Sequence, residues 1–147
     1  MNIQKNIVTR NGLEKAVDQI IGRHVFGNLY GIDPKMLGDE KYIVETVLEA
    51  ARRAKATILE IKSWTVEGPH GGVSAIALVV ESHIAIHTWP GYEYATVDVY
   101  TCGSTADPLE AFKTIIKRLR PRNYVAFYAD RSSGAQIDEL EVKRIKL

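Results

Sequence analysis

Apolar and polar positions recur with two different periods along this chain, and the periods predict its elements. A period near 3.6 residues places Ile43, Val47 and Ala50 on one face of a helix over residues 39–54. The same period over residues 107–119 predicts a second helix, which begins with a capping aspartate followed by a proline. Runs rich in β-branched and aromatic residues predict strands over residues 22–33, 56–66, 73–80, 83–89, 94–102 and 123–131. The alternation at 56–66 predicts a half-buried strand, and the continuous apolar run at 73–80 predicts a strand buried on both faces.

The order of these elements indicates the fold class. Links of hairpin length join the central strands, so we expect a two-layer α/β sandwich, with a largely antiparallel sheet and two helices on one face. No helix remains for the other face, which predicts association of two copies. We expect a single domain over residues 1–147, with accessory extensions at 1–20, which is polar and weakly helical, and at 132–147.

Composition narrows the classes of function. A length of 147 residues with 46% hydrophobic residues suits one core, and the net charge of +1 gives no reason to expect a nucleic acid or a membrane surface as partner. The single cysteine excludes an internal disulfide framework and a CxxC metal site, and it favours a reducing compartment. No apolar run approaches the roughly 20 residues of a membrane span. We therefore expect a cytoplasmic protein.

Glu81 and Ser82 interrupt the apolar pattern directly after the run at 73–80. One interpretation is a turn between two strands. A second is a Ser-His-Asp hydrolase, although the GxSxG turn of such enzymes is absent. A third is self-cleavage, in which the serine hydroxyl attacks the carbonyl of the preceding residue and elimination leaves a pyruvoyl group. Composition and periodicity do not choose among these three.

Two histidines and the cysteine are the other candidates for chemistry. His83 and His87 are four apart, and in a strand that spacing separates them by roughly 13 Å, too far to share a metal ion. Each alone suits a hydrogen-bonded position at a sheet edge. Cys102 shares the polar face of its strand with Asp98 and Tyr100, and its thiol is mostly protonated at neutral pH, so it can donate a proton.

The blocks ESHIAIHTWP (81–90) and DVYTCG (98–103) closely resemble the S-adenosylmethionine decarboxylase proenzymes of the short prokaryotic type. They also resemble the archaeal offshoot of that family, the pyruvoyl-dependent arginine decarboxylases. The likeness covers roughly residues 22–131. It implies self-cleavage between Glu81 and Ser82 into a β chain (1–81) and an α chain (82–147). Ser82 would become the pyruvoyl cofactor, which holds the substrate as a Schiff base.

The same resemblance implies roles for three further residues. Ser74 and His87 match the processing residues of the family, with His87 as the proton acceptor during elimination. Cys102 matches the catalytic proton donor. The family fold pairs through its sheets, which implies a homo-oligomer of αβ units, at least a dimer. We expect no metal ion, because His83 and His87 would lie too far apart in a strand to share one.

Two departures from the S-adenosylmethionine pattern bear on the substrate. No aromatic residue for stacking on adenine precedes the GVS block, and Gly91 replaces a ribose-binding glutamate, although Glu93 could substitute for it. We therefore favour decarboxylation of arginine to agmatine, in polyamine biosynthesis, over S-adenosylmethionine decarboxylation. Asp33, Glu60 and Glu67 are candidate partners for the guanidinium group. A non-catalytic paralogue that serves as a partner subunit is a further alternative.

Overall fold

The computed structural model describes residues 3–10, 13–134 and 140–147. The strands are β1 (Ile3–Arg10), β2 (Leu13–Ile20), β3 (Gly22–Tyr30), β4 (Ile58–Val66), β5 (Gly72–Val79), β6 (Ser82–Trp89), β7 (Tyr94–Cys102), β8 (Asn123–Asp130) and β9 (Val142–Ile145). The helices are α1 (Pro34–Leu37), α2 (Glu40–Arg53) and α3 (Pro108–Leu119), and a short 3-10 turn, η1, covers Pro90–Tyr92.

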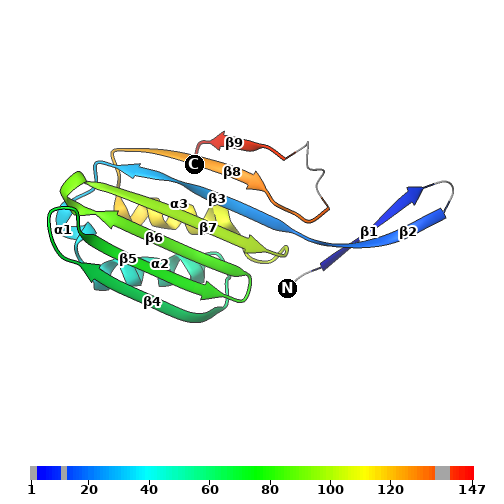
Figure 1. Cartoon of the computed structure of the whole chain (residues 1–147), viewed down its shortest axis with the longest axis horizontal. Coiled ribbons are helices and arrows are strands. Elements are labelled where there is room, and N and C mark those ends of the chain that lie inside the picture. The colour runs from blue at the N-terminus through cyan, green and yellow to red at the C-terminus, as the bar shows by residue number, and fades with distance from the viewer. Residues whose placement is uncertain (1–2, 11–12, 135–139) are drawn as a thin grey trace.

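A seven-stranded sheet forms one layer, in the order β4-β5-β6-β7-β3-β8-β9, and all its neighbours are antiparallel. Helices α2 and α3 lie side by side across one face of this sheet, as Figure 1 shows. The predicted two-layer α/β sandwich is confirmed. We call the face that the helices do not cover the open face.

Both long helices begin where the sequence places a capping aspartate. Asp39 accepts a hydrogen bond from the Tyr42 N–H at 3.1 Å, and Asp107 accepts one from the Leu109 N–H at 3.0 Å. The predicted apolar stripes face the sheet, although Leu109 and Ile116 are only partly buried. The fully buried side chains of the stripes are Ile43, Val47, Ala50, Ala51, Phe112 and Ile115.

The prediction that residues 73–80 are buried on both faces is wrong. Val73 and Ala75 point into the core, whereas Ser74 is half-buried and Leu78 is 43% exposed on the open face. The apolar run therefore reflects a face that the chain itself leaves uncovered. The segment predicted as half-buried over 56–66 is an edge strand and is mostly exposed.

The N-terminal segment was expected to be weakly helical, and the structure corrects this. Strands β1 and β2 pair along their whole length, from Ile3 opposite Ile20 to Arg10 opposite Leu13, and they extend away from the main sheet (Figure 1). The Asn-Gly dipeptide in the sequence between them is a strong hairpin signal. Within the C-terminal extension, β9 adds an edge strand to the sheet.

Thr88 links the sheet to α1 from a buried position. Its hydroxyl accepts a hydrogen bond from the Val73 N–H (2.9 Å) and donates one to the Leu37 carbonyl (2.7 Å). We expect Thr88→Val, which keeps the shape but removes both bonds, to lower the free energy of unfolding by about 1–3 kcal/mol in urea titrations. Thr114→Val is the control, because the Thr114 hydroxyl donates to the Glu110 carbonyl of its own helix near the surface. It should change the free energy of unfolding by less than about 0.5 kcal/mol. Equal effects of the two substitutions would contradict the prediction.

Candidate active site

The Glu81–Ser82 peptide lies at the tight connection between β5 and β6. Val79 pairs with Ser82, so only Val80 and Glu81 form the turn. Ser82 has a φ angle of 148°, a positive value that residues other than glycine rarely adopt. Such a conformation costs of order 1–3 kcal/mol. The peptide is therefore both in a turn and strained, which is the condition that self-cleavage requires.

The carbonyl of this peptide has a strong hydrogen-bond donor. The backbone N–H of Cys102 donates to the Glu81 carbonyl oxygen at 2.7 Å. On its other side, the Glu81 carboxylate accepts a hydrogen bond from the Thr57 N–H at 3.1 Å. A donor on a carbonyl oxygen stabilises the negative charge that develops there during nucleophilic attack. Cys102 thus contacts the reacting peptide through its backbone.

The Cys102 side chain is less accessible than the alternation suggests. It ends β7 and is only 4% exposed, although the pattern placed it on the polar face. The next residue, Gly103, has a positive φ of 88°, which turns the chain away from the strand. Cys102 is opposite Gly22 in the register, where the Tyr100 hydroxyl and the Arg131 carbonyl approach so closely that a side chain would not fit. The thiol is held in a desolvated position beside the Glu81–Ser82 turn.

Ser74 and His87, the two further processing candidates, meet across β5 and β6. The Ser74 hydroxyl and His87 Nδ1 are 2.8 Å apart, and the two residues are direct partners in the register. His87 lies five positions after Ser82 on β6, a distance of roughly 16 Å along an extended strand. The structure therefore brings Ser74 and His87 together, but it does not bring this pair to the Ser82 of the same chain.

Asp98 joins two histidines on the open face, and the sequence reasoning did not single it out. Its carboxylate lies 2.8 Å from His24 Nε2 on β3 and 2.8 Å from His83 Nε2 on β6. Burial raises the pKa of Asp98, but the hydrogen bonds from His83 and His24 outweigh it, so the net shift is downward. The sequence did carry a signal for Asp98, because its carboxylate lies in the middle of a predicted strand, between Val97 and Val99, where β-branched residues are more common than aspartate.

A shallow cavity of about 430 Å³ lies on the open face, but neither Ser82 nor Cys102 is among the residues that line it. Its lining includes His83, His87 and Asp98, together with Phe26 and Asn28 of β3. It combines apolar walls with a few polar groups, as small-molecule sites do.

The three carboxylates predicted as guanidinium partners are not among the residues that line this cavity. Asp33 caps α1, where it accepts a hydrogen bond from the Lys35 N–H, and Glu60 pairs with Lys62 on the edge strand. Glu67 is exposed in a turn. Among the residues that line the cavity, Asp98 alone carries a carboxylate.

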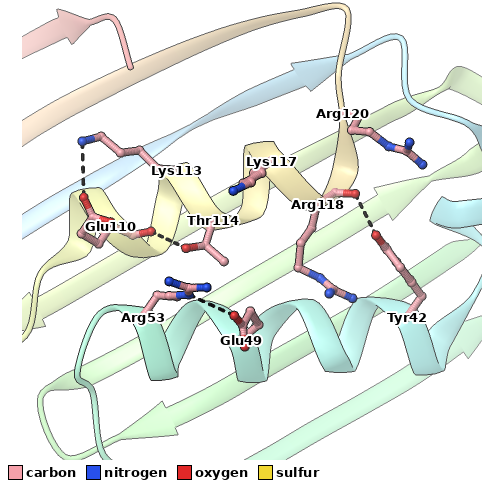
Figure 2. A pocket seen from close by; sticks show the side chains of 9 residues that line it. All are labelled: Tyr42, Glu49, Arg53, Glu110, Lys113, Thr114, Lys117, Arg118 and Arg120. Atoms are coloured by element: carbon pink, nitrogen blue, oxygen red, sulfur yellow. Dashed lines mark hydrogen bonds and ion pairs between the residues drawn. The ribbon is translucent and has the colours of Figure 1, made fainter.

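A second cavity, of about 480 Å³, lies between α2 and α3 on the opposite side of the molecule (Figure 2). It is rich in cations, but helix electrostatics accounts for them. Lys117 and Arg118 occupy the last turn of α3, where basic side chains favour the helix dipole. Hydrogen bonds from Arg52 and Arg53 lower the pKa of Glu49 to about 2. We therefore place the chemistry on the open face.

No group of three or more histidine, cysteine, aspartate or glutamate side chains within 3–10, 13–134 and 140–147 is arranged to hold a metal ion. None of the helices in those same ranges combines the length and the apolar character needed to cross a membrane.

The chain is similar to a protein family and to several known proteins over most of its length. A family model described as S-adenosylmethionine decarboxylase matches residues 23–132. The chain is 58% identical over 130 residues to the arginine decarboxylase proenzyme of Ignicoccus hospitalis, covering 88% of this chain and 90% of that protein. It is 56% identical over 133 residues to the arginine decarboxylase proenzyme of Hyperthermus butylicus, covering 90% and 93%.

A solved structure agrees with these sequence matches. The crystal structure of the adenosylmethionine decarboxylase from Aquifex aeolicus superposes with a TM-score of 0.71 at 32% identity, covering 81% of this chain and 95% of that one. The matched family segment contains Ser74, Glu81, Ser82, His87 and Cys102. The predicted resemblance is confirmed, and the chain belongs to the S-adenosylmethionine decarboxylase family.

Proposed function

We propose that this protein is the proenzyme of a pyruvoyl-dependent decarboxylase that converts arginine to agmatine and CO2. The observation that carries the proposal is the strained Ser82 in the β5–β6 turn, with the Cys102 N–H on the carbonyl that Ser82 would attack. The choice of arginine is supported by the names of relatives that are 46–58% identical over most of their length.

The first reaction is the cleavage of the chain by its own residues. The Ser82 hydroxyl attacks the Glu81 carbonyl carbon, while the Cys102 N–H stabilises the developing oxyanion. The C–N bond breaks and leaves an ester between Glu81 and the Ser82 oxygen. A base then removes the α-proton of Ser82, and Glu81 leaves as a free carboxylate. This elimination separates residues 1–81 from residues 82–147, and hydrolysis of the remaining enamine releases ammonia and leaves a pyruvoyl ketone at position 82.

The surroundings of Ser82 fit the pyruvoyl group that this cleavage would produce. Thr101 is directly opposite Ser82 in the register, and its hydroxyl is fully buried with no hydrogen-bond partner among the described residues. A buried donor without an acceptor is costly, and a carbonyl oxygen at position 82 would supply one. The group would provide a ketone that binds the substrate amine and accepts the electrons released with CO2.

Cys102 acts after CO2 has left. Its thiol lies at the end of β7, next to the strand that begins with Ser82. We propose that this thiol donates the proton that replaces the lost carboxylate on the substrate α-carbon. The thiol must remain reduced for this task, which supports a cytoplasmic location.

A second copy of the chain would complete the site. The Ser74–His87 pair lies roughly 16 Å from the Ser82 of its own chain, so His87 cannot take the Ser82 α-proton there. The open face that carries this pair also exposes large apolar side chains, with Trp64 at 49% and Leu78 at 43%. Two open faces packed together would cover this surface and bring the pair of one copy to the Ser82 of the other. We therefore infer at least a homodimer of αβ units.

The substrate prediction is tested with the cleaved protein and two substrates that carry a labelled carboxyl group. We expect release of labelled CO2 from arginine, with kcat/KM at least about fiftyfold above that for S-adenosylmethionine, because the chain lacks the stacking aromatic and the ribose-binding carboxylate. Release from S-adenosylmethionine alone would establish the runner-up activity. A chain that cuts itself but acts on neither substrate would contradict both, and one that stays whole would support the non-catalytic paralogue.

A further inference from the structure

The His24–Asp98–His83 cluster connects three neighbouring strands on the open face. Asp98 is on β7, which lies between β3 with His24 and β6 with His83. An ionised carboxylate only accepts hydrogen bonds, so both Nε2 atoms donate to it. The side chain of His24 is 16% exposed, whereas those of His83 and Asp98 are 34% and 43% exposed, so the bond to His24 is the better shielded of the two charge-assisted bonds. The cluster is a rigid cross-link over the centre of the sheet.

His83 gives this cross-link a special place in the chain. It directly follows Ser82, so it is the second residue of the α chain that the proposed cut between Glu81 and Ser82 would produce. Before cleavage, the Val80–Glu81 turn holds the start of β6 covalently. After cleavage, position 82 is a chain end, and chain ends fray unless other contacts hold them.

The side chain of His83 is the nearest one that can hold this new end. It reaches Asp98 on the next strand, and through Asp98 it reaches His24 on the strand beyond. The Tyr100 ring lies beside both histidines, with ring centroids 5.8 Å from His24 and 6.1 Å from His83. The guanidinium of Arg131 lies over the Tyr100 ring at 4.6 Å. The arrangement surrounds His83 with fixed partners on the side of the sheet that carries the cavity.

We propose that Asp98, His83 and His24 are positioning residues that hold the new terminus of the α chain beside Cys102 after self-cleavage. The proposal rests on the proposed function, because it needs the cut at residue 82. It assigns no contact with the substrate to the cluster. It makes the cluster unnecessary for cleavage, when the turn is intact, and necessary for turnover, when the turn is gone.

Asp98→Asn tests this separation because it keeps the shape and removes the charge. We expect the variant to cut itself to completion, and to show a kcat for arginine at least about tenfold lower with a KM within about twofold of wild type. Hydrogen exchange of the amides at 83–86 should be faster than in wild type after cleavage and unchanged before it. Asp130→Asn is the matched control, because Asp130 is exposed and its carboxylate accepts a hydrogen bond from the nearby Ser132 N–H. It should match wild type in every assay.

His24→Gln provides a second variant, which leaves Asp98 and the residue next to the cut in place. It should also be cleaved normally and lose turnover, by a smaller factor than Asp98→Asn. Normal turnover of both variants after cleavage would overturn the proposal, and so would their failure to be cleaved while wild type is cut. A wild-type chain that stays whole would instead reject the proposed function itself, so the two failures are distinguishable.

Discussion

A chain with Ser82→Ala is expected to stay whole, as a single band of 16.4 kDa, and to release no CO2 from arginine. The methyl group has no oxygen to attack the Glu81 carbonyl, so neither the cut nor the ketone can form. Wild type should give two bands of roughly nine and seven kilodaltons at about 110 Da per residue. Denaturing gels and labelled-CO2 release measure the two effects. Ser63→Ala, on the edge strand β4, is the matched control and should be cleaved like wild type.

The same substitution also tests the role of a second copy. His87→Ala alone should not be cleaved, because the proton acceptor is lost. Co-expression of His87→Ala with Ser82→Ala should restore cleavage of the His87→Ala chain, because the Ser82→Ala copy supplies an intact Ser74–His87 pair. A size tag on one chain identifies which is cut.

Absence of rescue on co-expression would contradict the shared site, and cleavage of His87→Ala alone would contradict the role of His87. His70→Ala is the control for loss of a histidine. His70 is exposed in the turn after β4, where its Nδ1 lies 2.7 Å from the Tyr92 hydroxyl, so this variant should be cleaved normally.

Cys102→Ala has the second large expected effect, and it falls on a different step. The donor to the Glu81 carbonyl is the backbone N–H, which alanine keeps, so we expect cleavage into two chains. The thiol that protonates the substrate is lost, so kcat for arginine should fall by about 10²–10⁴-fold. Cys102→Ser should be impaired almost as strongly, because a hydroxyl is a far weaker acid than a thiol. CO2 release per cleaved chain measures the loss.

Val99→Ala separates lost chemistry from lost packing in this test. Val99 is on the same strand and is fully buried against the helices, so its truncation lowers stability without touching the site. We expect it to keep near-normal turnover at a temperature where it is folded. Turnover by Cys102→Ala at the rate of Val99→Ala would reject Cys102 as the proton donor.

The core elements of this fold are predictable from sequence because their side chains face one environment. The stripes of α2 and α3 and the alternation of β6 and β7 are set by the same buried layer, so period and burial agree. The N-terminal hairpin differs, because β1 and β2 pair only with each other in the described sheets. The weakly helical pattern expected for residues 1–20 did not indicate this pairing, which the Asn-Gly dipeptide in the sequence favours.

The residues of the candidate site were identified by resemblance, but their geometry was not predictable. Sequence spacing could not show that Cys102 meets Glu81 through its backbone, since that contact depends on the register of β6 and β7. Asp98 was overlooked because a lone carboxylate in a strand is ordinary until its cross-strand neighbours are known. Register, which only the fold supplies, decides which polar residues become partners.

The separation of the Ser74–His87 pair from the Ser82 of its own chain has a kinetic consequence. If the base for the second step of cleavage comes from another copy, a newly made chain alone lacks a residue that cleavage requires. Maturation is then bimolecular when chains are scarce, and its half-time lengthens as their concentration falls. Encounter between two folded copies serves as the checkpoint for activation, so an isolated or misfolded chain is never cut.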